Sequence, residues 1–169
     1  MAEGVKVLSG PNMLKLVENM IDPELQIQPN GVDLTLMAVE KIVDSGSVDF
    51  DNSDRRISKS VRLFFDEDDW IMLESGAYKV IFNEIVTIPL DYMAIAFPRS
   101  SLLRCGATIE TAVWDAGYRG RSEALLLVMN PAGLRLKRDA RILQMVFLKL
   151  QDEVREDEAY KGIYQFENE

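Results

Sequence analysis

The sequence contains no histidine and a single cysteine, Cys105. The absence of histidine excludes Ser-His-Asp and Cys-His catalysis, a histidine-ligated zinc ion and histidine as a general base. One cysteine excludes an intrachain disulfide and a metal site built from cysteines. Any chemistry must therefore rest on carboxylates, hydroxyls, lysine, arginine and tyrosine, together with a hard metal ion if one is bound.

Long apolar runs are also lacking, since none approaches the roughly 20 residues of a membrane span, and the first residues do not resemble a signal peptide. We therefore expect a cytoplasmic protein with no membrane partner. Positive charge is scarce too, because 19 Lys and Arg against 28 Asp and Glu give a net charge of −9. This argues against duplex nucleic acid as a partner, because nonspecific DNA affinity comes mainly from neutralised phosphates. A small phosphorylated ligand remains compatible with local Arg and Lys residues and with Mg²⁺.

The chain has the size and composition of one globular domain, with 169 residues of which 47% are apolar. Apolar residues recur at helical spacing after Ser9, a residue type that caps helices, and predict an N-terminal helix over 9–22. Residues 41–60 are rich in Asp, Ser, Gly and Arg, which predicts a polar loop or a loosely held hairpin. Residues 151–169 begin as an acidic segment and end in aromatics, which predicts a flexible tail that folds down as a lid.

Many short strand-like segments, separated by turn or charged residues, fill the rest of the chain. They lack the alternation of strands and helices that a parallel α/β sheet needs. We therefore predict one mainly β domain over 1–169, folded as a jelly roll or β-barrel. The predicted strands are 28–36, 61–65, 70–73, 77–82, 85–89, 93–97, 107–113, 124–129, 134–136 and 141–150.

The segment 111–120, Thr-Ala-Val-Trp-Asp-Ala-Gly-Tyr-Arg-Gly, places Asp115 where an apolar strand runs into a glycine-bearing turn of a β-hairpin or β-arch. An acid in this position is held rigidly and still meets a ligand. Aspartate is also common in turns because its side chain bonds the local backbone. On this segment alone we favour the turn interpretation.

Three further segments carry residues suited to bind phosphate or a metal. Arg99, Ser100 and Ser101 stand at the start of a predicted helix, as a phosphate cradle or as a plain serine cap beside a surface arginine. Gln144 interrupts an apolar run and is either a core hydrogen bonder or a ligand contact. Asp33 either supports the water shell of a metal or pairs with an arginine.

The order of these segments resembles the dUTPase and dCTP deaminase superfamily, and the resemblance covers nearly the whole chain. It implies that family's distorted jelly roll and favours a functional role for Asp115. The tail is similar to the deaminase type, not to the glycine-rich fifth motif of trimeric dUTPases. The similar segments are 8–16 (Leu-Ser-Gly-Pro-Asn-Met-Leu-Lys-Leu), 27–36 (Ile-Gln-Pro-Asn-Gly-Val-Asp-Leu-Thr-Leu), 96–104 (Ala-Phe-Pro-Arg-Ser-Ser-Leu-Leu-Arg), 114–120, 140–147 (Ala-Arg-Ile-Leu-Gln-Met-Val-Phe) and 160–165 (Tyr-Lys-Gly-Ile-Tyr-Gln).

One residue separates the two activities of this superfamily. In the deaminases a glutamate in the strand after the third motif shuttles the proton, and in the dUTPases that place is apolar. Counting forward from Asp115 puts it at Leu125, and counting back from Asn130 puts it at Leu127, so the chain carries an insertion near Glu123. A leucine cannot shuttle a proton, so the resemblance implies a dUTPase. Glu123 shares the strand face of the two leucines and leaves a dCTP deaminase, or a bifunctional enzyme, as the alternative; a nonenzymatic nucleotide-binding regulator is another.

The resemblance implies hydrolysis of dUTP to dUMP and pyrophosphate, with Asp115 activating water for in-line attack on the α-phosphorus. Mg²⁺ would be held mainly by the substrate phosphates, with Asp33 contributing through water. A homotrimer with active sites between subunits is also implied. The implied substrate contacts are Arg99, Ser100, Ser101 and Gln144 for phosphates, Tyr118 for deoxyribose, the backbone of 108–113 with Thr111 for uracil, and Tyr160, Lys161, Tyr164 and Gln165 of the tail.

Overall fold

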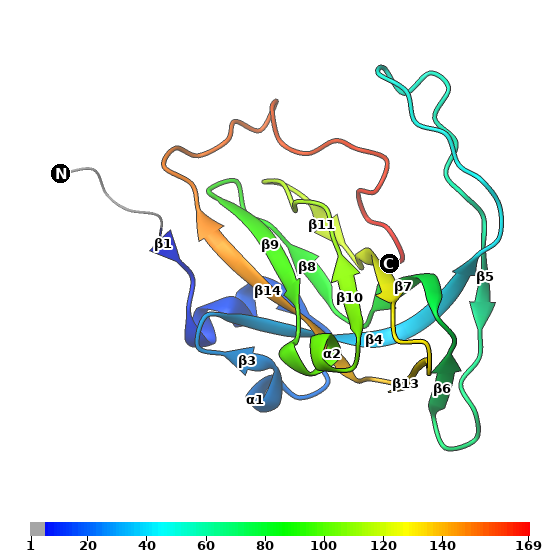
Figure 1. Ribbon diagram of the computed structural model, residues 1–169. Helices are drawn as coiled ribbons and strands as arrows, with labels where there is room; N and C mark the ends of the chain where they lie inside the picture. The colour runs from blue at the N-terminus through cyan, green and yellow to red at the C-terminus, as the bar shows by residue number, and fades with distance from the viewer. Residues whose placement is uncertain (1–5) are drawn as a thin grey trace.

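The computed structural model describes residues 6–169, and short strands make up most of its regular structure (Figure 1). The strands are β1 (Lys6–Val7), β2 (Val17–Glu18), β3 (Ile27–Gln28), β4 (Gly31–Ile42), β5 (Ser60–Leu63), β6 (Trp70–Leu73), β7 (Gly76–Phe82), β8 (Ile85–Thr87), β9 (Tyr92–Pro98), β10 (Ala107–Glu110), β11 (Arg119–Gly120), β12 (Glu123–Val128), β13 (Leu134–Lys137) and β14 (Arg141–Lys149). The helical segments are a 3₁₀ helix (Gly10–Lys15), α1 (Pro23–Gln26) and α2 (Ser100–Arg104). The mainly β prediction is confirmed. Within the described residues, no helix is long and apolar enough to cross a membrane.

The long strand β4 holds the main sheet together. Its residues 32–35 pair with β14 and its residues 36–41 pair with β7, all antiparallel. The register shifts in both ladders, and such irregularities bend a strand and increase its twist. The sheet therefore curls along the order β1-β14-β4-β7-β12-β10, with β9 on β14 and with β3 and β5 on β4. Two small sheets, β11-β8-β2 and β13-β6, complete the fold.

The core fills the inside of this curled sheet. The first six residues of β4 are all buried, so that strand is covered on both faces. Leu34, Phe82 and Phe147 are fully buried and belong to one contiguous cluster. Gly31 is needed where β4 meets β14, because a Cβ atom there would lie 2.4 Å from the Met145 carbonyl oxygen. Only glycine lets the two backbones approach this closely.

The predicted helix over 9–22 is wrong. A 3₁₀ helix ends at Lys15, the Ser9 side chain makes no capping hydrogen bond, and β2 follows and pairs with β8. Asn19 has a φ of 59°, a left-handed conformation that an α-helix does not contain. Ile21, expected on the buried face of that helix, is 54% exposed. Strand pairing with β8 satisfied this backbone instead of helical hydrogen bonds.

The strand predictions are confirmed apart from their ends. Most observed ends lie within three residues of the predicted ones, and β4 extends six residues further than predicted. The predicted hairpin or arch around 111–120 is present, because β10 pairs antiparallel with β12 on either side of it. This pairing brings the segment that contains Asp115 to one end of the sheet.

Two irregular segments lie over the same end of the sheet. Residues 43–59, which we call the 43–59 hairpin, leave β4, project away from the sheet and return to β5 (Figure 1). The Ser47–Arg56 bridge and the bond from Val43 N to the Lys59 carbonyl hold the hairpin together. The C-terminal tail runs back from β14 across the sheet (Figure 1), and its last residues contact Arg119 of β11 and Glu123 of β12. Both segments carry apolar side chains, so neither is purely polar.

Candidate functional site

Asp115 begins a tight turn between β10 and β11. The amide of Tyr118 donates to the Asp115 carbonyl (3.1 Å), and Gly117 has a φ of 88°, which favours glycine at the third position of such a turn. Trp114 pairs with Ala94 of β9 through two backbone hydrogen bonds of 2.9 and 3.0 Å. Within residues 6–169 the exposed Asp115 carboxylate makes no hydrogen bond or ion pair. The backbone therefore closes the turn, and the carboxylate remains available to a ligand.

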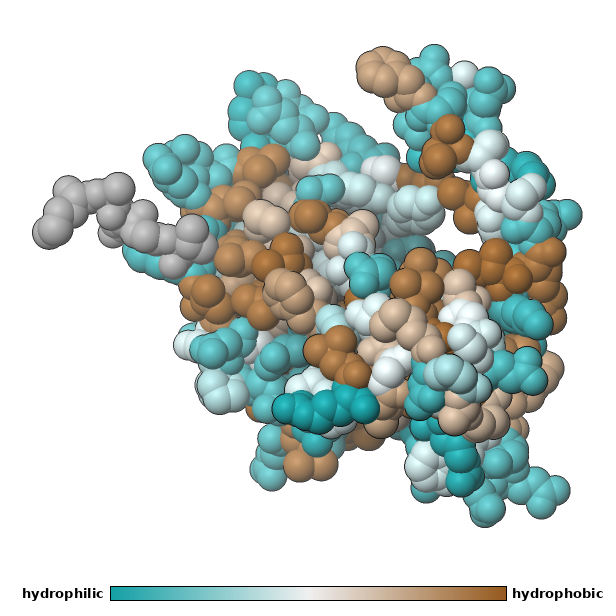
Figure 2. All heavy atoms as spheres, in the orientation of Figure 1, coloured by the Kyte–Doolittle hydropathy of each residue, from teal (hydrophilic) through white to brown (hydrophobic). Residues whose placement is uncertain are grey.

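Asp115 lines a cavity of about 660 Å³, which we call the Asp115 cavity. The segment 112–125 forms one wall, the tail forms another, and Val48 and Ile57 of the 43–59 hairpin close the outer side. Figure 2 shows the hairpin standing off from the body of the molecule with a hollow between them. The volume falls in the range of small-ligand sites, and apolar walls with a few charged groups are typical of such sites.

The charges in the Asp115 cavity are mainly acidic. Glu123 and Glu167 join Asp115 there. Both cations that line the cavity are already paired: Lys79 with Glu40 (2.9 Å) and Glu123 (3.1 Å), and Arg56 with Asp44 (3.3 Å). Burial lowers the pKa of Lys79, but its bonds to the two glutamates outweigh burial and raise that pKa above its ordinary value. Lys79 is therefore a fixed counterion, and triphosphate binding needs positive charge from elsewhere.

Tyr118, predicted to contact the deoxyribose, lines this cavity but is only 5% exposed. Its hydroxyl donates to Glu167 Oε1 (2.8 Å) and lies 3.0 Å from Ser122 Oγ. Burial raises the pKa of Tyr118 far above its ordinary value, and the charge of Glu167 adds to this effect. The rings of Tyr160 and Tyr118 pack in a T-shaped arrangement, with their centroids 5.6 Å apart. Tail residues thus cover the face of Tyr118 in this conformation.

The tail is bound to the Asp115 turn along several residues. Tyr160 N donates to the Ala116 carbonyl (2.9 Å), and the Gln165 side chain accepts from Arg119 N (3.0 Å) and donates to the Gly117 carbonyl (2.9 Å). A Cβ atom on Gly117 would lie 2.8 Å from the Cβ of a tail residue, so the turn and the tail are in close contact.

The four predicted tail contacts divide into two groups. Tyr160 and Tyr164 line the Asp115 cavity. Gln165 clamps the turn, as described, and Lys161 donates to the Asp157 carbonyl at 2.9 Å outside the cavity. Thr111, the predicted uracil contact, is half-buried and lines neither cavity, although its neighbours Ala112 and Val113 line the Asp115 cavity.

A second group of predicted residues meets at the junction of β4, β9, α2 and β14. Asp33, Arg99, Ser100 and Gln144 line a cavity of about 310 Å³. Gln144 lies beside Asp33 because the two are partners in the β14–β4 ladder. The N-cap of α2 is Arg99, so neither serine acts as the cap. Ser101 is exposed in the first turn of α2 and does not line the cavity.

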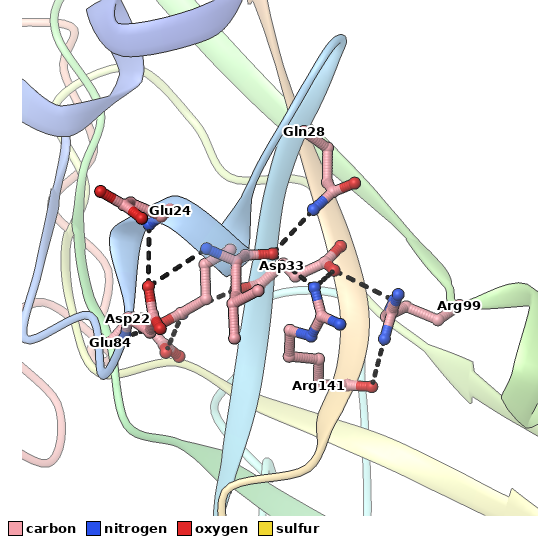
Figure 3. Close-up of polar contacts among 9 residues, drawn as sticks. Asp22, Glu24, Gln28, Asp33, Glu84, Arg99 and Arg141 are labelled. Carbon is pink, nitrogen blue, oxygen red and sulfur yellow. Dashed lines mark hydrogen bonds and ion pairs between the residues drawn. The ribbon is translucent and has the colours of Figure 1, made fainter.

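Asp33 pairs with two arginines, the alternative that its sequence position left open. Its Oδ2 lies 3.0 Å from Arg99 Nε and 3.4 Å from Arg141 Nη1, and the side chain is 2% exposed (Figure 3). We call these three residues the arginine cluster. Burial raises the pKa of Asp33, although both guanidinium groups act to lower it. Asp33 thus orients Arg99 at the edge of the smaller cavity. The guanidinium group of Arg99 can bind an anion there.

The buried carboxylate of Glu84 belongs to a hydrogen-bond network that reaches the arginine cluster through Gln26. It accepts hydrogen bonds from Gln26 Nε2 (2.7 Å), Thr35 N (2.8 Å) and Thr35 Oγ1 (2.6 Å), and it is fully buried. Gln26 Nε2 also donates to the Asp33 carbonyl (2.9 Å), and Arg141 donates to the carbonyl of Leu25 in α1. Burial raises the pKa of Glu84 against these donors. Sequence reasoning missed this network, because neither Gln26 nor Glu84 belongs to a recognisable motif.

The structure therefore distributes the predicted residues over two places. Asp115, Tyr118, Tyr160 and Tyr164 line the Asp115 cavity, and the other cavity is lined by Asp33, Arg99, Ser100 and Gln144. Among the residues that the structure describes, none lines both cavities. Within one chain, the candidate base and the candidate phosphate contacts do not share a pocket.

The residues present do not form a protein cage for Mg²⁺. Among residues 6–169 no group of three or more acidic, cysteine or histidine side chains could hold a metal ion. Asp33, the predicted contributor, is already held by Arg99 and Arg141. Any Mg²⁺ would have to take most of its ligands from phosphate oxygens and water, which Mg²⁺ commonly does.

The strand β12 contains both positions counted for the deaminase glutamate. Leu125 lines the Asp115 cavity, and Leu127 does not. Glu123, two residues before Leu125 on the same strand face, also lines it and is held by Lys79 and by Asn168 Nδ2 (3.2 Å). Sequence reasoning missed Lys79, as it missed the apolar residues of the 43–59 hairpin, which stand out in an otherwise polar segment.

Comparison with known proteins agrees with this fold. Residues 7–150 match the family model described as dCTP deaminase-like. The chain belongs to this dCTP deaminase-like family. Within it, the chain is 60% identical over 153 residues to a protein of Methanosarcina acetivorans named "Probable deoxyuridine 5'-triphosphate nucleotidohydrolase", covering 90% of this chain and 88% of that one.

More distant relatives carry the same kind of name. The Archaeoglobus fulgidus protein of that name is 46% identical, over 96% of this chain and 97% of its own. The "Deoxyuridine 5'-triphosphate nucleotidohydrolase" of Methanocaldococcus jannaschii is 38% identical, over 94% of this chain and 98% of its own. A crystal structure of 2'-deoxycytidine 5'-triphosphate deaminase from Agrobacterium tumefaciens shares the fold, with a TM-score of 0.68 and 21% identity over 91% of this chain. This chain spans about half (49%) of that deaminase.

Proposed function

We propose that this protein is a dUTP diphosphatase that hydrolyses dUTP to dUMP and pyrophosphate. The observation that carries the proposal is the Asp115 carboxylate, which is exposed at a small-ligand cavity on a turn that the backbone holds closed. Leu125 of β12 lines the same cavity, and its apolar side chain cannot shuttle a proton. The names of relatives at 38–60% identity support the same activity.

In this mechanism Asp115 accepts a hydrogen bond from a water molecule and takes its proton as the oxygen attacks the α-phosphorus. The bond from that phosphorus to the bridging oxygen breaks, and pyrophosphate leaves with the electron pair. An aspartate is a weak base, so most of its contribution comes from holding the water in line, where good orientation is worth several powers of ten in rate. The mechanism thus depends on a rigid Asp115 turn.

The phosphate groups need positive charge, which the arginine cluster supplies. Arg99 is oriented by Asp33, and Ser100 and Gln144 offer hydrogen-bonding groups beside it. Mg²⁺ bound to the phosphate oxygens would neutralise part of their charge. Arg99 therefore binds and orients the triphosphate, while Tyr118 and the backbone of 108–113 contact the nucleoside.

We further propose that each active site forms between two subunits of a homotrimer, with the Asp115 cavity of one chain facing the arginine cluster of the next. The separation of the two cavities supports this arrangement. So does the apolar surface beside the arginine cluster, where Phe97 is 58% and Leu103 53% exposed. Exposed apolar groups of this kind mark surfaces that another protein covers.

Subunit mixing tests the shared site. Arg99→Ala and Asp115→Asn are each expected to be inactive, and the two variants are unfolded together and refolded as mixed trimers. If each site takes Arg99 from one chain and Asp115 from another, random assembly restores about one quarter of the sites. Mass spectrometry verifies that the trimers are mixed. If such mixed trimers recover no activity, the result contradicts a shared site.

The alternative is a dCTP deaminase, and the position of Glu123 in the Asp115 cavity is the observation that favours it. The protein is incubated with Mg²⁺ and either dUTP or dCTP, and the products are separated by chromatography. We expect dUMP and pyrophosphate from dUTP and no uracil nucleotide from dCTP. Surviving dUTP contradicts the proposal, tight binding without turnover identifies a regulator, and uracil nucleotides from dCTP identify a deaminase.

A further inference from the structure

Ser122 lies between β11 and β12, in the region where the two counts for the deaminase glutamate disagree. Its side chain is almost fully buried, at 2% exposure. The indole Nε1 of Trp114 donates to Ser122 Oγ (2.7 Å), and Tyr118 Oη lies 3.0 Å from the same oxygen. Trp114 and Tyr118 stand on either side of the Asp115 turn. One serine hydroxyl therefore contacts side chains from both ends of that turn.

The partners determine the direction of each hydrogen bond. An indole nitrogen can only donate, so Ser122 Oγ accepts from Trp114. Tyr118 Oη donates to Glu167 Oε1 (2.8 Å), which leaves Ser122 as the donor to Tyr118. The bonds thus run from Trp114 through Ser122 and Tyr118 to Glu167, and each hydroxyl both donates and accepts. Bonds ordered in this way strengthen one another.

The far end of this hydrogen-bond chain lies in the tail, and the residue before Ser122 holds the same part of the tail. Arg121 N donates to the Glu167 carbonyl (2.9 Å), and Arg121 Nε donates to the Asn168 carbonyl (3.1 Å). Ser122 and Arg121 therefore connect the turn to the docked tail through separate bonds.

We propose that Ser122 is a positioning residue, whose hydroxyl fixes both ends of the Asp115 turn and couples the turn to the docked tail. The inference rests on the proposed function, in which Asp115 holds the attacking water. Because the Asp115 carboxylate has no hydrogen bond or ion pair within residues 6–169, its position depends on its neighbours in the turn. A misplacement of about 1 Å at a reacting group costs on the order of a hundredfold in rate.

The kinetic test compares Ser122→Ala with Ser75→Ala. Ser75 is exposed between β6 and β7, its Oγ donates to the Val128 carbonyl (3.0 Å), and it lines neither cavity. This control therefore loses one partly buried serine hydrogen bond outside the Asp115 turn. Ser122→Ala should lower kcat for dUTP by about ten- to a hundredfold, with a change in KM below about threefold. Ser75→Ala should leave both values within about twofold of wild type. A wild-type kcat in Ser122→Ala overturns the inference.

Amide hydrogen exchange tests the same inference without turnover. The Tyr118 amide donates to the Asp115 carbonyl, so its exchange reports opening of the turn. In Ser122→Ala it should exchange about tenfold faster or more than in wild type and Ser75→Ala, under conditions where all three are folded. Unchanged exchange overturns the inference. If wild type leaves dUTP intact, the proposed function fails, and exchange still decides whether Ser122 holds the turn.

A second variant keeps the test decisive if Ser122→Ala does not fold. Tyr118→Phe keeps the ring and removes only the hydroxyl that bonds Ser122 and Glu167. The amide at position 118 should again exchange about tenfold faster or more, because the turn loses its connection to the tail. Wild-type exchange in this variant overturns the inference.

Discussion

The carboxylate of Asp33 forms a 3.0 Å ion pair with the guanidinium group of Arg99, although Asp33 is buried near the start of the longest strand. A charge inside a sheet is costly unless it is paired, and Arg99 and Arg141 both pair with it. The consequence is mutual: the arginines make the buried carboxylate tolerable, and the carboxylate fixes the direction of Arg99. The proposed binding surface for phosphate is therefore anchored in the core.

Asp33→Asn should weaken both folding and phosphate binding. The variant leaves two guanidinium groups without their carboxylate, but these side chains are about one third exposed (30% and 32%). We therefore expect a loss of about 1–3 kcal/mol in the free energy of unfolding, below the value for a fully buried pair. Urea unfolding measures the change, and titration with pyrophosphate should show weaker binding.

Asp69→Asn is the matched control for this substitution. Its carboxylate pairs with Arg138 at 2.9 Å on the surface, and its φ of 63° is one that asparagine also adopts. The control should lose less than about 1 kcal/mol and keep pyrophosphate binding. Equal losses in the two variants would show that the Asp33 pairs carry no special weight.

Asp115→Asn should abolish hydrolysis and leave the fold intact. The carboxylate makes no hydrogen bond or ion pair within the described part of the chain, so its loss removes no contact. We expect turnover to fall by about 10²- to 10⁴-fold, with unchanged thermal unfolding and retained binding of dUTP. Full activity in this variant would remove Asp115 from the mechanism.

Removal of the tail from Tyr160 onward should slow turnover more than it destabilises the fold. The tail covers Tyr118 and bonds the Asp115 turn, but no strand of the curled sheet belongs to it. We expect kcat/KM for dUTP to fall by about tenfold or more, and Tm by about 2–4 °C. An unchanged rate would show that the tail is not a lid.

The buried Glu84 should make stability depend on pH in a definite direction. Burial raises its pKa above the ordinary value of 4.5, so the folded protein holds this proton to higher pH than the unfolded chain does. The unfolding free energy that wild type owes to this group should therefore fall as the pH rises from about 4.5 through the raised pKa. Urea unfolding across this window measures the effect.

Glu84→Gln isolates that contribution. The amide cannot ionise, but it places an N–H₂ group against one of the donors to Glu84, such as the Thr35 amide, and loses an acceptor. The variant should be less stable than wild type, and the gap between the two should narrow as the pH rises. A gap that stays constant or widens with pH would contradict a raised pKa for Glu84.

The sequence predicted the sheet well because its strands carry local signals. Apolar segments bounded by Gly, Asp and Asn residues became β6, β7 and β12 within a residue or two. The N-terminal segment misled because helical spacing of apolar residues does not reveal that β2 can pair with β8. Pro23, the residue after the predicted helix, begins α1 with Asp22 as its cap. Long-range pairing outweighed a local pattern there.

The residues of the candidate site were recognisable, but their arrangement was not. Arg99 and Gln144 meet through β-ladder registers that motif order does not contain, and Asp115 lies in a different cavity. The supporting residues Glu84 and Ser122 act through buried hydrogen bonds to partners up to 58 positions away. Such partners become visible only once the chain is folded.

Gly31 limits how this protein can change. A Cβ atom at this position would lie 3.1 Å from Gln144 Cγ as well as against the β14 backbone, so any replacement pushes on the sheet and on a proposed phosphate contact together. A substitution at Gly31 would therefore reduce stability and, under the proposed function, phosphate binding at the same time. A mutational scan should find few tolerated residues at Gly31, although it lines neither cavity.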